Sequence, residues 1–450
     1  MLSHDSGPVR SLLHRFLPRG ALRRDLWVTT ADAAAFSVMV GCGETYIPAF
    51  ALALGMGPVA AGMMASVPVL VGAIFQLVTP LAVARLGTNR GWCIACTTVQ
   101  SLSFLPFVFW AIQGEARLWQ LLVAASVYWA AGMAGAPAWN SWMGTLVPER
   151  MRTSFFAQRN RLGQFGVFFG FVVGGAVLQF SERRGQTLAA FAVLFALAGV
   201  CRLVSTALLA SCREPKRPNP AGGPAPALLR RVRTAVSAIA TSPSGALVAY
   251  VCSFAFACQF SGPYFTPYML REMGFSYGAF MLVMGTTFLA KALALPALGR
   301  LGTRIGSLGL LWLGSLSIMP LALLWLPSDN VWYLVGVQLF AGACWAAYEL
   351  AVVLLFFDAV LHHERTGVVT AYNLGLAVAT LAGAATGGLL LRSLGENRTA
   401  YFTVFAVSSL LRIATIPLLR RVRVVKEQED QPDGNRDSWA RLSRNVRARP

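Results

Sequence analysis

Twelve long apolar stretches recur along the chain, and each can cross a bilayer as a helix, which takes about 20 residues. Charged residues make up 13% of the sequence, whereas soluble domains carry about 25%. A chain so poor in charge cannot cover a soluble surface. We therefore predict an all-α integral membrane protein with spans at residues 27–54, 58–84, 91–112, 118–146, 164–181, 187–210, 246–269, 278–298, 306–326, 331–355, 367–391 and 400–419.

Basic residues gather on one side of these spans. Of the 38 Lys and Arg residues, 29 lie in segments on the same side of the membrane as the N-terminus, and six lie in the loops on the opposite side. The positive-inside rule then places both termini in the cytoplasm. This topology accounts for the net charge of +19, so we expect a lipid bilayer as partner and no nucleic acid. Arg outnumbers Lys 35 to 3, which points to a GC-rich bacterial genome and hence to the inner membrane.

The sequence divides into five predicted parts. These are a cytoplasmic segment (1–26), an N-terminal six-helix half (27–211), a cytoplasmic linker (212–245), a C-terminal six-helix half (246–420) and a tail (421–450). Apolar residues at helical spacing beside arginines predict interfacial helices over 9–17 and 228–239. The polar composition of the tail predicts disorder.

The two halves are a duplication around a Pro-rich linker. Residues 85–88, Arg-Leu-Gly-Thr, return as residues 300–303, an offset of 215. Gly174-Gly175 returns as Gly387-Gly388, an offset of 213. Seven such matches follow in the same order, and each offset crosses an even number of spans. The repeats therefore have the same orientation in the membrane, which is typical of one class of transporter.

Three motifs resemble those of the major facilitator superfamily over about residues 25–420. Residues 80–90, Pro-Leu-Ala-Val-Ala-Arg-Leu-Gly-Thr-Asn-Arg, are similar to the family signature Gly-x-x-x-Asp-Arg-x-Gly-Arg-Arg, and residues 299–304 are a second copy. Residues 166–175 resemble the antiporter signature Gly-x-x-x-Gly-Pro-x-x-Gly-Gly. The resemblance implies two pseudo-symmetric halves of six helices and gating loops that contain Arg85, Gly87, Arg90, Arg300, Gly302 and Arg304.

The chain also departs from the family pattern. Ala84 stands where the family carries an Asp that helps to latch the cytoplasmic gate, so the latch must use other partners. Phe171 replaces the Pro of the antiporter signature, and Tyr128 stands where proton antiporters often carry an Arg. The resemblance thus supports the fold and leaves proton antiport unassigned.

Glycines at every fourth position in spans five and eleven allow helices to approach closely in lipid. We interpret them as helix-packing positions, with sliding of the halves during transport as the alternative. They are Gly166, Gly170, Gly174, Gly383 and Gly387.

Six ionisable residues lie inside predicted spans, where a charge is expensive to keep. They are Asp32, Glu44, Arg202, Lys291, Glu349 and Arg412. Arg202 and Arg412 lie two or three turns from the cytoplasmic end, so we expect both to snorkel towards the head groups. Asp32 lies about two turns into span one and can pair with a cytoplasmic Arg.

Glu44 lies deeper, after Gly41 and Gly43 and before Pro48, in a stretch that should loosen the helix. In the family, the first span lines the central cavity, and acids on it often bind protons or cationic substrates. We expect a coupling or substrate role for Glu44, with a structural hydrogen bond inside the N-terminal half as the alternative.

Lys291 in span eight and Glu349 in span ten carry opposite charges within the C-terminal half, so we expect them to meet. The pair is either a fixed internal ion pair or one that opens when substrate or a proton arrives. Asn140 in span four and Gln259 in span seven are further candidates for a polar cavity.

Enzyme motifs are missing from the sequence. No Gly-x-x-x-x-Gly-Lys-Ser/Thr loop is present, and Cys93-x-x-Cys96 is the only metal-like spacing, without a second pair. We expect no catalytic residue, metal or cofactor. Our hypothesis is a monomeric, proton-coupled secondary transporter of a small solute. The alternatives are a non-transporting assembly factor or sensor on the same fold and an uncoupled facilitator.

Overall fold

The computed structural model describes residues 20–215, 245–359 and 365–423. The helices predicted over 9–17 and 228–239, most of the linker and nearly all of the tail lie outside the described residues.

Six predicted spans of the first half appear as helices, and several of them are broken. The elements are α2 (Ala21–Cys42), η1 (Glu44–Tyr46), α3 (Ile47–Ala53), α4 (Pro58–Gln76), α5 (Thr79–Leu86), α6 (Asn89–Leu102), α7 (Phe104–Gln113), α8 (Leu118–Leu146), α9 (Glu149–Glu182) and α10 (Thr187–Ser211). The first span is α2, η1 and α3 together. Its α-helix ends at Cys42, so the loosening predicted around Glu44 is confirmed.

The second half repeats this order. Its elements are α12 (Gly245–Gln259), η2 (Gly262–Tyr264), α13 (Phe265–Pro267), η3 (Tyr268–Glu272), α14 (Tyr277–Ile318), η4 (Leu323–Trp325), α15 (Val331–Ala359), α16 (Arg365–Ser393), α17 (Arg398–Ala414) and α18 (Ile416–Leu419). The seventh span, α12 to η3, is broken near Gly262 much as the first span is broken near Glu44.

By length and hydropathy, eleven helical segments in the described residues can cross a membrane. One of them, Tyr277–Trp325, is 49 residues long and contains two of the twelve predicted spans. The chain turns between these two spans at Gly306, whose φ of 76° lies in the left-handed region that favours glycine. The all-α, two-half architecture is as predicted.

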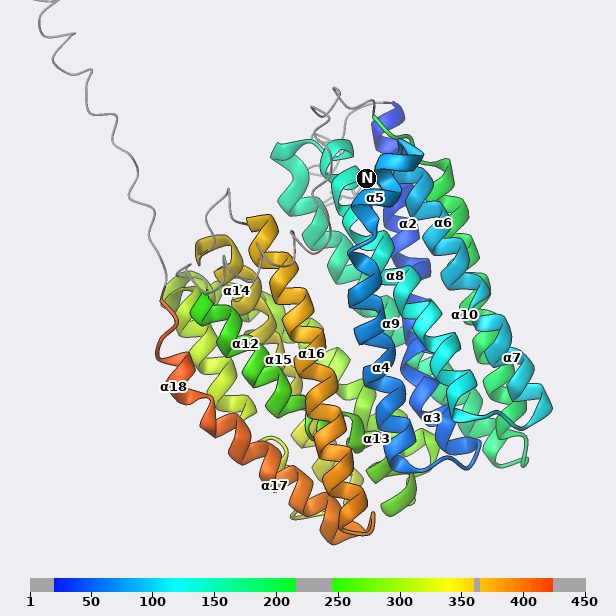
Figure 1. Ribbon diagram of the computed structural model, residues 1–450, viewed down its shortest axis with the longest axis vertical. Helices are drawn as coiled ribbons and strands as arrows, with labels where there is room; N and C mark the ends of the chain where they lie inside the picture. The colour runs from blue at the N-terminus through cyan, green and yellow to red at the C-terminus, as the bar shows by residue number, and fades with distance from the viewer. Residues whose placement is uncertain (1–19, 216–244, 360–364, 424–450) are drawn as a thin grey trace, which may run out of the picture.

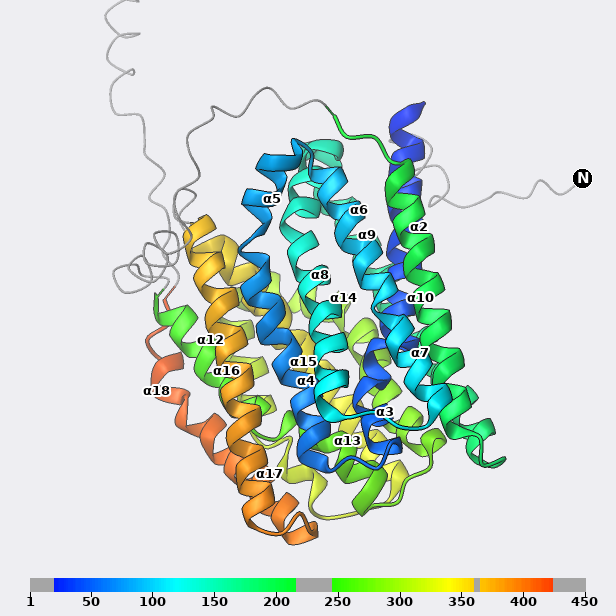
Figure 2. The same ribbon diagram turned by 45° about the vertical axis from the view of Figure 1, so that its right-hand side comes forward.

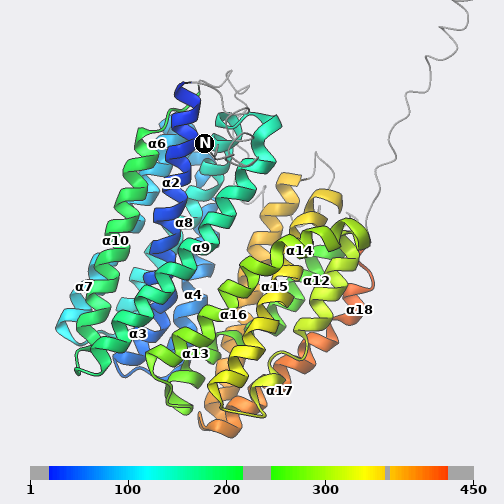
Figure 3. The same cartoon turned by 180° about the vertical axis from the view of Figure 1, so that it is seen from behind.

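The helices form two bundles, α2–α10 and α12–α18 (Figure 1). Within the first bundle α2 packs on α9 and α4 packs on α8, while α12 packs on α16 in the second. Between the bundles α9 contacts α14, and α4 contacts α16, which run beside each other in Figure 2. The two bundles converge at the end where α3 and α13 lie and diverge towards the start of α2 (Figure 3).

The glycines of α9 lie where α2 comes close. A Cβ atom on Gly170 would lie 2.5 Å from the carbonyl oxygen of Val38, and one on Gly166 would lie 2.8 Å from the Cβ of Ser37. In the second half a Cβ on Gly383 or Gly387 would overlap the carbonyl oxygen of Phe256 or Phe260. A methyl group at these positions would force the two backbones apart.

We expect Gly170→Ala and Gly387→Ala each to destabilise the protein by about 1–3 kcal/mol, because the added methyl group overpacks a backbone contact. Unfolding of the purified protein in mixed micelles measures the effect. Gly336→Ala in α15 is the control, since a Cβ there meets no atom within 4 Å. Equal stability of all three variants would contradict the packing interpretation.

Candidate functional site

Glu44 faces the fourth span from the break in the first. It is the first residue of the short turn η1, and its half-buried carboxylate accepts a hydrogen bond from the Tyr128 hydroxyl, with 2.6 Å between the oxygens. Tyr128 lies on α8 and is 1% exposed. The turn ends at Tyr46, whose hydroxyl donates to the carbonyl of Phe171 on α9 at 2.6 Å. Side chains of one three-residue turn therefore form hydrogen bonds with both α8 and α9.

A second buried cluster of polar side chains lies nearer the start of α2, around Asp32. Arg202 on α10 donates from Nε to Gln100 Oε1 at 2.8 Å and from Nη1 to Ser205 Oγ at 2.8 Å. The Ser205 hydroxyl in turn donates to Asp32 Oδ1 at 2.6 Å. Arg159 of α9 completes the cluster by donating from Nη2 to Asp32 Oδ2 at 3.1 Å. Charged hydrogen bonds thus join α2, α6, α9 and α10.

Asp32 therefore pairs with an Arg from a segment predicted to be cytoplasmic, as expected from the sequence. The Arg159 guanidinium also lies over the Trp139 ring, 4.3 Å from its centroid, and Arg159 Nε donates to the carbonyl of Thr29 at 3.4 Å. The cation is shared by α2, α8 and α9.

The prediction that Arg202 and Arg412 snorkel is wrong. Their exposed fractions are 7% and 3%. Arg412 donates from Nη1 to the carbonyl of Ile318 at 3.0 Å and from Nη2 to Ser261 Oγ at 3.1 Å. Depth in the span suggested that both could reach the head groups, but polar partners on neighbouring helices hold them inside their bundles.

A cavity of about 330 Å³ is lined by both Asp32 and Glu44, the two acidic residues inside the predicted spans of the first half. It has room for roughly ten water molecules at about 30 Å³ each. Its walls come from α2, α6, α8, α9 and α10, and its polar side chains are Asp32, Glu44, Thr97, Gln100, Tyr128, Arg159 and Arg202. Gln100, Tyr128 and Arg159 were not among the predicted site residues; a Gln inside span three was the signal that could have identified Gln100.

Lys291 and Glu349 meet in the second half, as predicted. Lys291 Nζ lies 2.6 Å from Glu349 Oε1, and the two side chains are 21% and 54% exposed. The pair is therefore accessible, unlike the Asp32–Arg159 pair. Asn140 is exposed on α8 and Gln259 is half-buried at the end of α12, and neither lines the cavity that contains Glu44.

The loop after the second span is held by Glu214, beyond the end of α10. Its carboxylate accepts hydrogen bonds from the Thr88 hydroxyl and from the backbone N–H groups of Asn89 and Arg90, the last two at 2.9 and 3.3 Å. Arg90 donates to the carbonyl of Ala210. Partial burial alone would raise the pKa of the Glu214 carboxyl, but these hydrogen bonds outweigh it and lower that pKa. This clamp stays within the first half.

The two predicted gating loops differ in detail. Gly87 adopts a φ of 71° at the end of α5, with exposed Arg85 just before it. Its counterpart Gly302 is helical and buried, and Gly306 makes the turn in its place. Arg300 and Arg304 are exposed, and Arg300 Nε donates to the carbonyl of Pro296 at 3.4 Å.

A sequence model of the Major Facilitator Superfamily matches residues 33–266 and 247–450. The chain belongs to the major facilitator superfamily. It is a multi-pass membrane protein of a transporter family, which confirms the predicted family and fold. No curated protein sequence matches it.

Solved transporters of this superfamily share the fold. The nucleoside transporter NupG matches with a TM-score of 0.63 at 10% identity, over 89% of this chain and 99% of that one. A bacterial homolog of the human lysosomal transporter Spinster, inward-facing and unoccupied, matches with a TM-score of 0.63 at 16% identity, over 93% and 95%. At these identities the likeness shows the fold alone.

We expect Arg202→Met to destabilise this superfamily member by about 1–3 kcal/mol, because it leaves the buried Gln100 and Ser205 oxygens without their charged donor. Unfolding in mixed micelles measures the effect. Arg392→Met is the control, since Arg392 is exposed at the end of α16. Similar stabilities for the two variants would show that the cluster contributes little.

Glu214→Gln should lower thermal stability at pH 7, because the ionised carboxylate holds the loop. The folded-state pKa lies below the ordinary value of 4.5, so this stabilisation is fully present above pH 4.5 and is lost as the pH falls through the folded pKa. The difference between wild type and variant should therefore shrink on acidification towards pH 4. Glu115→Gln, an exposed change in the loop before α8, should make no difference at either pH.

Proposed function

We propose that the protein is a proton-coupled secondary transporter of a small solute, in which Glu44 binds the coupling proton. The observation that carries this proposal is the turn Glu44–Tyr46. Its first residue places a carboxylate in the cavity that Gln100 and Arg202 also line, and its last residue contacts the other half of the protein, with the Tyr46 ring centroid 6.3 Å from that of Phe280. Protonation of Glu44 would change a group two residues from the interface between the halves.

The contact between the halves supports alternating access. Phe171 packs against Phe280 and Phe288 of α14 with ring centroids 5.8 and 5.6 Å apart. Gln179 Oε1 accepts a hydrogen bond from the Gly278 N–H at 2.5 Å, and Glu182 Oε2 accepts one from the Tyr277 N–H at 3.4 Å. These side chains of α9 satisfy backbone donors in the first turn of α14, which has no helical partner for them. Rocking of the halves would release these contacts.

The orientation follows from the charge distribution. We place the basic loops and both termini on the cytoplasmic side of a bacterial inner membrane. The contacts between α9 and α14 then close the protein on the outer side, and the conformation is inward-facing. Transport would then proceed by rocking of segments 27–211 and 246–420 about a site between them.

The Lys291–Glu349 pair supports a role in substrate binding or gating. Both side chains are partly exposed. A charged group of a solute can therefore replace either partner without leaving the other charge buried and unpaired. The pair would open as the solute binds and close again after release.

The substrate is best sought by ligand-induced stabilisation, because a bound ligand stabilises by RT ln(1 + [L]/Kd). The panel should contain nucleosides, because NupG is a nucleoside transporter of the same fold, together with sugars, amino acids and organic cations, at pH 6 and pH 8. A ligand that stabilises is then tested for uptake into proteoliposomes. No stabilisation by any class would favour the assembly-factor or sensor alternative.

In these proteoliposomes, Glu44→Gln should reduce accumulation driven by an imposed pH gradient at least tenfold. Gln keeps the hydrogen bond with Tyr128 but cannot carry a proton, so exchange of labelled for unlabelled solute should persist. Glu272→Gln, an exposed change at the end of η3, should leave both rates unchanged. Undiminished accumulation by Glu44→Gln would rule out the coupling role, and transport that ignores the pH gradient in the wild type would identify a facilitator.

A further inference from the structure

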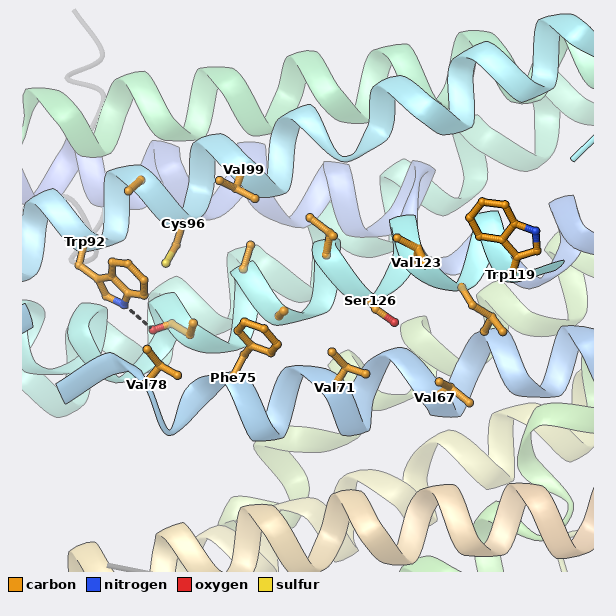
Figure 4. Close-up of a pocket in the computed structure, with 16 residues that line it drawn as sticks. Val67, Val71, Phe75, Val78, Trp92, Cys96, Val99, Trp119, Val123 and Ser126 are labelled. Carbon is orange, nitrogen blue, oxygen red and sulfur yellow. Dashed lines mark hydrogen bonds between the residues drawn. The ribbon is translucent and has the colours of Figure 1, made fainter. Parts of the chain in front are cut away.

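The outer surface of the first half contains a long apolar groove. It runs between α4, α6 and α8, separated by α8 from the cavity that contains Glu44, and has a volume of about 640 Å³ (Figure 4). Phe75, Val99 and Val123 extend into it from the three helices. These side chains are 52%, 45% and 55% exposed, so the groove opens onto the surface that the bilayer covers.

Polar groups contribute almost nothing to the groove. The Trp92 indole N–H at one end donates to the carbonyl of Ala134 at 3.0 Å, and Thr79 Oγ1 donates to the same carbonyl at 2.6 Å. The indole therefore presents a ring and not a free donor. Among the lining residues no side chain is charged, and Ser126 carries the single aliphatic hydroxyl. A head group, a peptide or a polar solute would find no partner here.

The length of the groove suits a hydrocarbon chain. Its lining residues on α8 run from Trp119 to Ala134, which is about 22 Å at a rise of 1.5 Å per residue. The groove is thus longer than one leaflet of hydrocarbon, which is about 15 Å or half of the 30 Å core, so an acyl chain can lie along it for its whole length. Trp92 and Trp119 lie at its two ends.

We propose that this groove is a binding site for one acyl chain of a membrane phospholipid. It is a concave part of an apolar surface, and Leu102 and Leu105 further along the third span are exposed as well. The site recognises the chain by apolar contact along its length, and the head group stays outside. Binding to it does not depend on which solute the protein transports.

The bound acyl chain would also cover the thin wall between the groove and the cavity that contains Glu44. Ala131 of α8 lines both the groove and the cavity that contains Glu44 and Tyr128. Small residues make this seam between α6 and α8, and a Cβ on Gly135 would lie 3.2 Å from the Cβ of Cys96. A bound acyl chain therefore packs on the outside of the helix whose inner face holds the Tyr128–Glu44 hydrogen bond.

The test is lipid retention by the full-length protein purified in detergent. Native mass spectrometry counts dioleoyl lipids bound per chain, with phosphatidylcholine and phosphatidylglycerol added separately. Val123→Trp obstructs the groove near its middle, and Val200→Trp is the matched control, because Val200 on α10 is 56% exposed and lies outside the groove. We expect Val123→Trp to lose at least half of the retained lipid with either head group, and Val200→Trp to retain it.

Thermal stability gives a second measurement. Added dioleoyl lipid should raise the Tm of the wild type and of Val200→Trp equally, and that of Val123→Trp by less than half as much. If Val123→Trp does not fold, Val99→Phe narrows the groove with a smaller side chain and should show the same loss. Unchanged retention by the groove variants, or retention that follows the head group at constant chain, would overturn the proposal.

Discussion

Inside a bilayer a charged or polar group has to find its partner within the protein, because the hydrocarbon offers none. The first half meets this constraint by sharing partners among helices. Asp32 on α2 accepts from Arg159 on α9 and from Ser205 on α10, and Ser205 and Gln100 accept from Arg202. Each helix of the cluster is held by charged hydrogen bonds as well as by packing, so we infer that this half moves as one body.

The two halves have similar backbone breaks and hydrogen bonds, but they differ in their buried charged groups. Tyr46 and Tyr264 occupy matching turns, and each hydroxyl donates to a carbonyl of the neighbouring span, Phe171 at 2.6 Å and Ala384 at 2.5 Å. Arg202 and Arg412 also match in position. The difference lies one hydrogen bond further on, because Ser205 beside Arg202 donates to the Asp32 carboxylate, whereas Ser261 beside Arg412 donates to Ser408. In the described residues, the second half therefore repeats the turn and the buried arginine without a carboxylate in the Arg412 cluster.

The fold was predictable because its signals are local or periodic. Span length, the repeated loops and the placement of Lys and Arg depend only on neighbours in the sequence. The meeting of Lys291 with Glu349 was predictable for a different reason, since two opposite charges in one apolar half have few other partners. The same reasoning paired Asp32 with an Arg from the cytoplasmic side.

The errors arose where the outcome depended on distant residues. Snorkelling of Arg202 was expected from its depth alone, but Gln100 lies 102 residues away in sequence and 2.8 Å away in space. Gly302 matched Gly87 in the repeat, yet the turn uses Gly306, because a helix can run on until a residue with a left-handed backbone interrupts it. Tyr128 attracted notice only as a departure from a family pattern, and its contact with Glu44 required the fold.

These differences suggest a division of labour between the halves. Asp32 is buried and Glu44 half-buried beside one cavity of the first half, and the turn that begins at Glu44 reaches the interface, which suits a proton that must be held away from bulk water. The ion pair of the second half is accessible, which suits a solute that must enter and leave. Glu44 belongs to the half that contributes Phe171 to the contact between the halves, and the Lys291–Glu349 pair belongs to the half that contributes Phe280. A change in protonation on one side and a change in pairing on the other can therefore both alter the interface that has to open during transport.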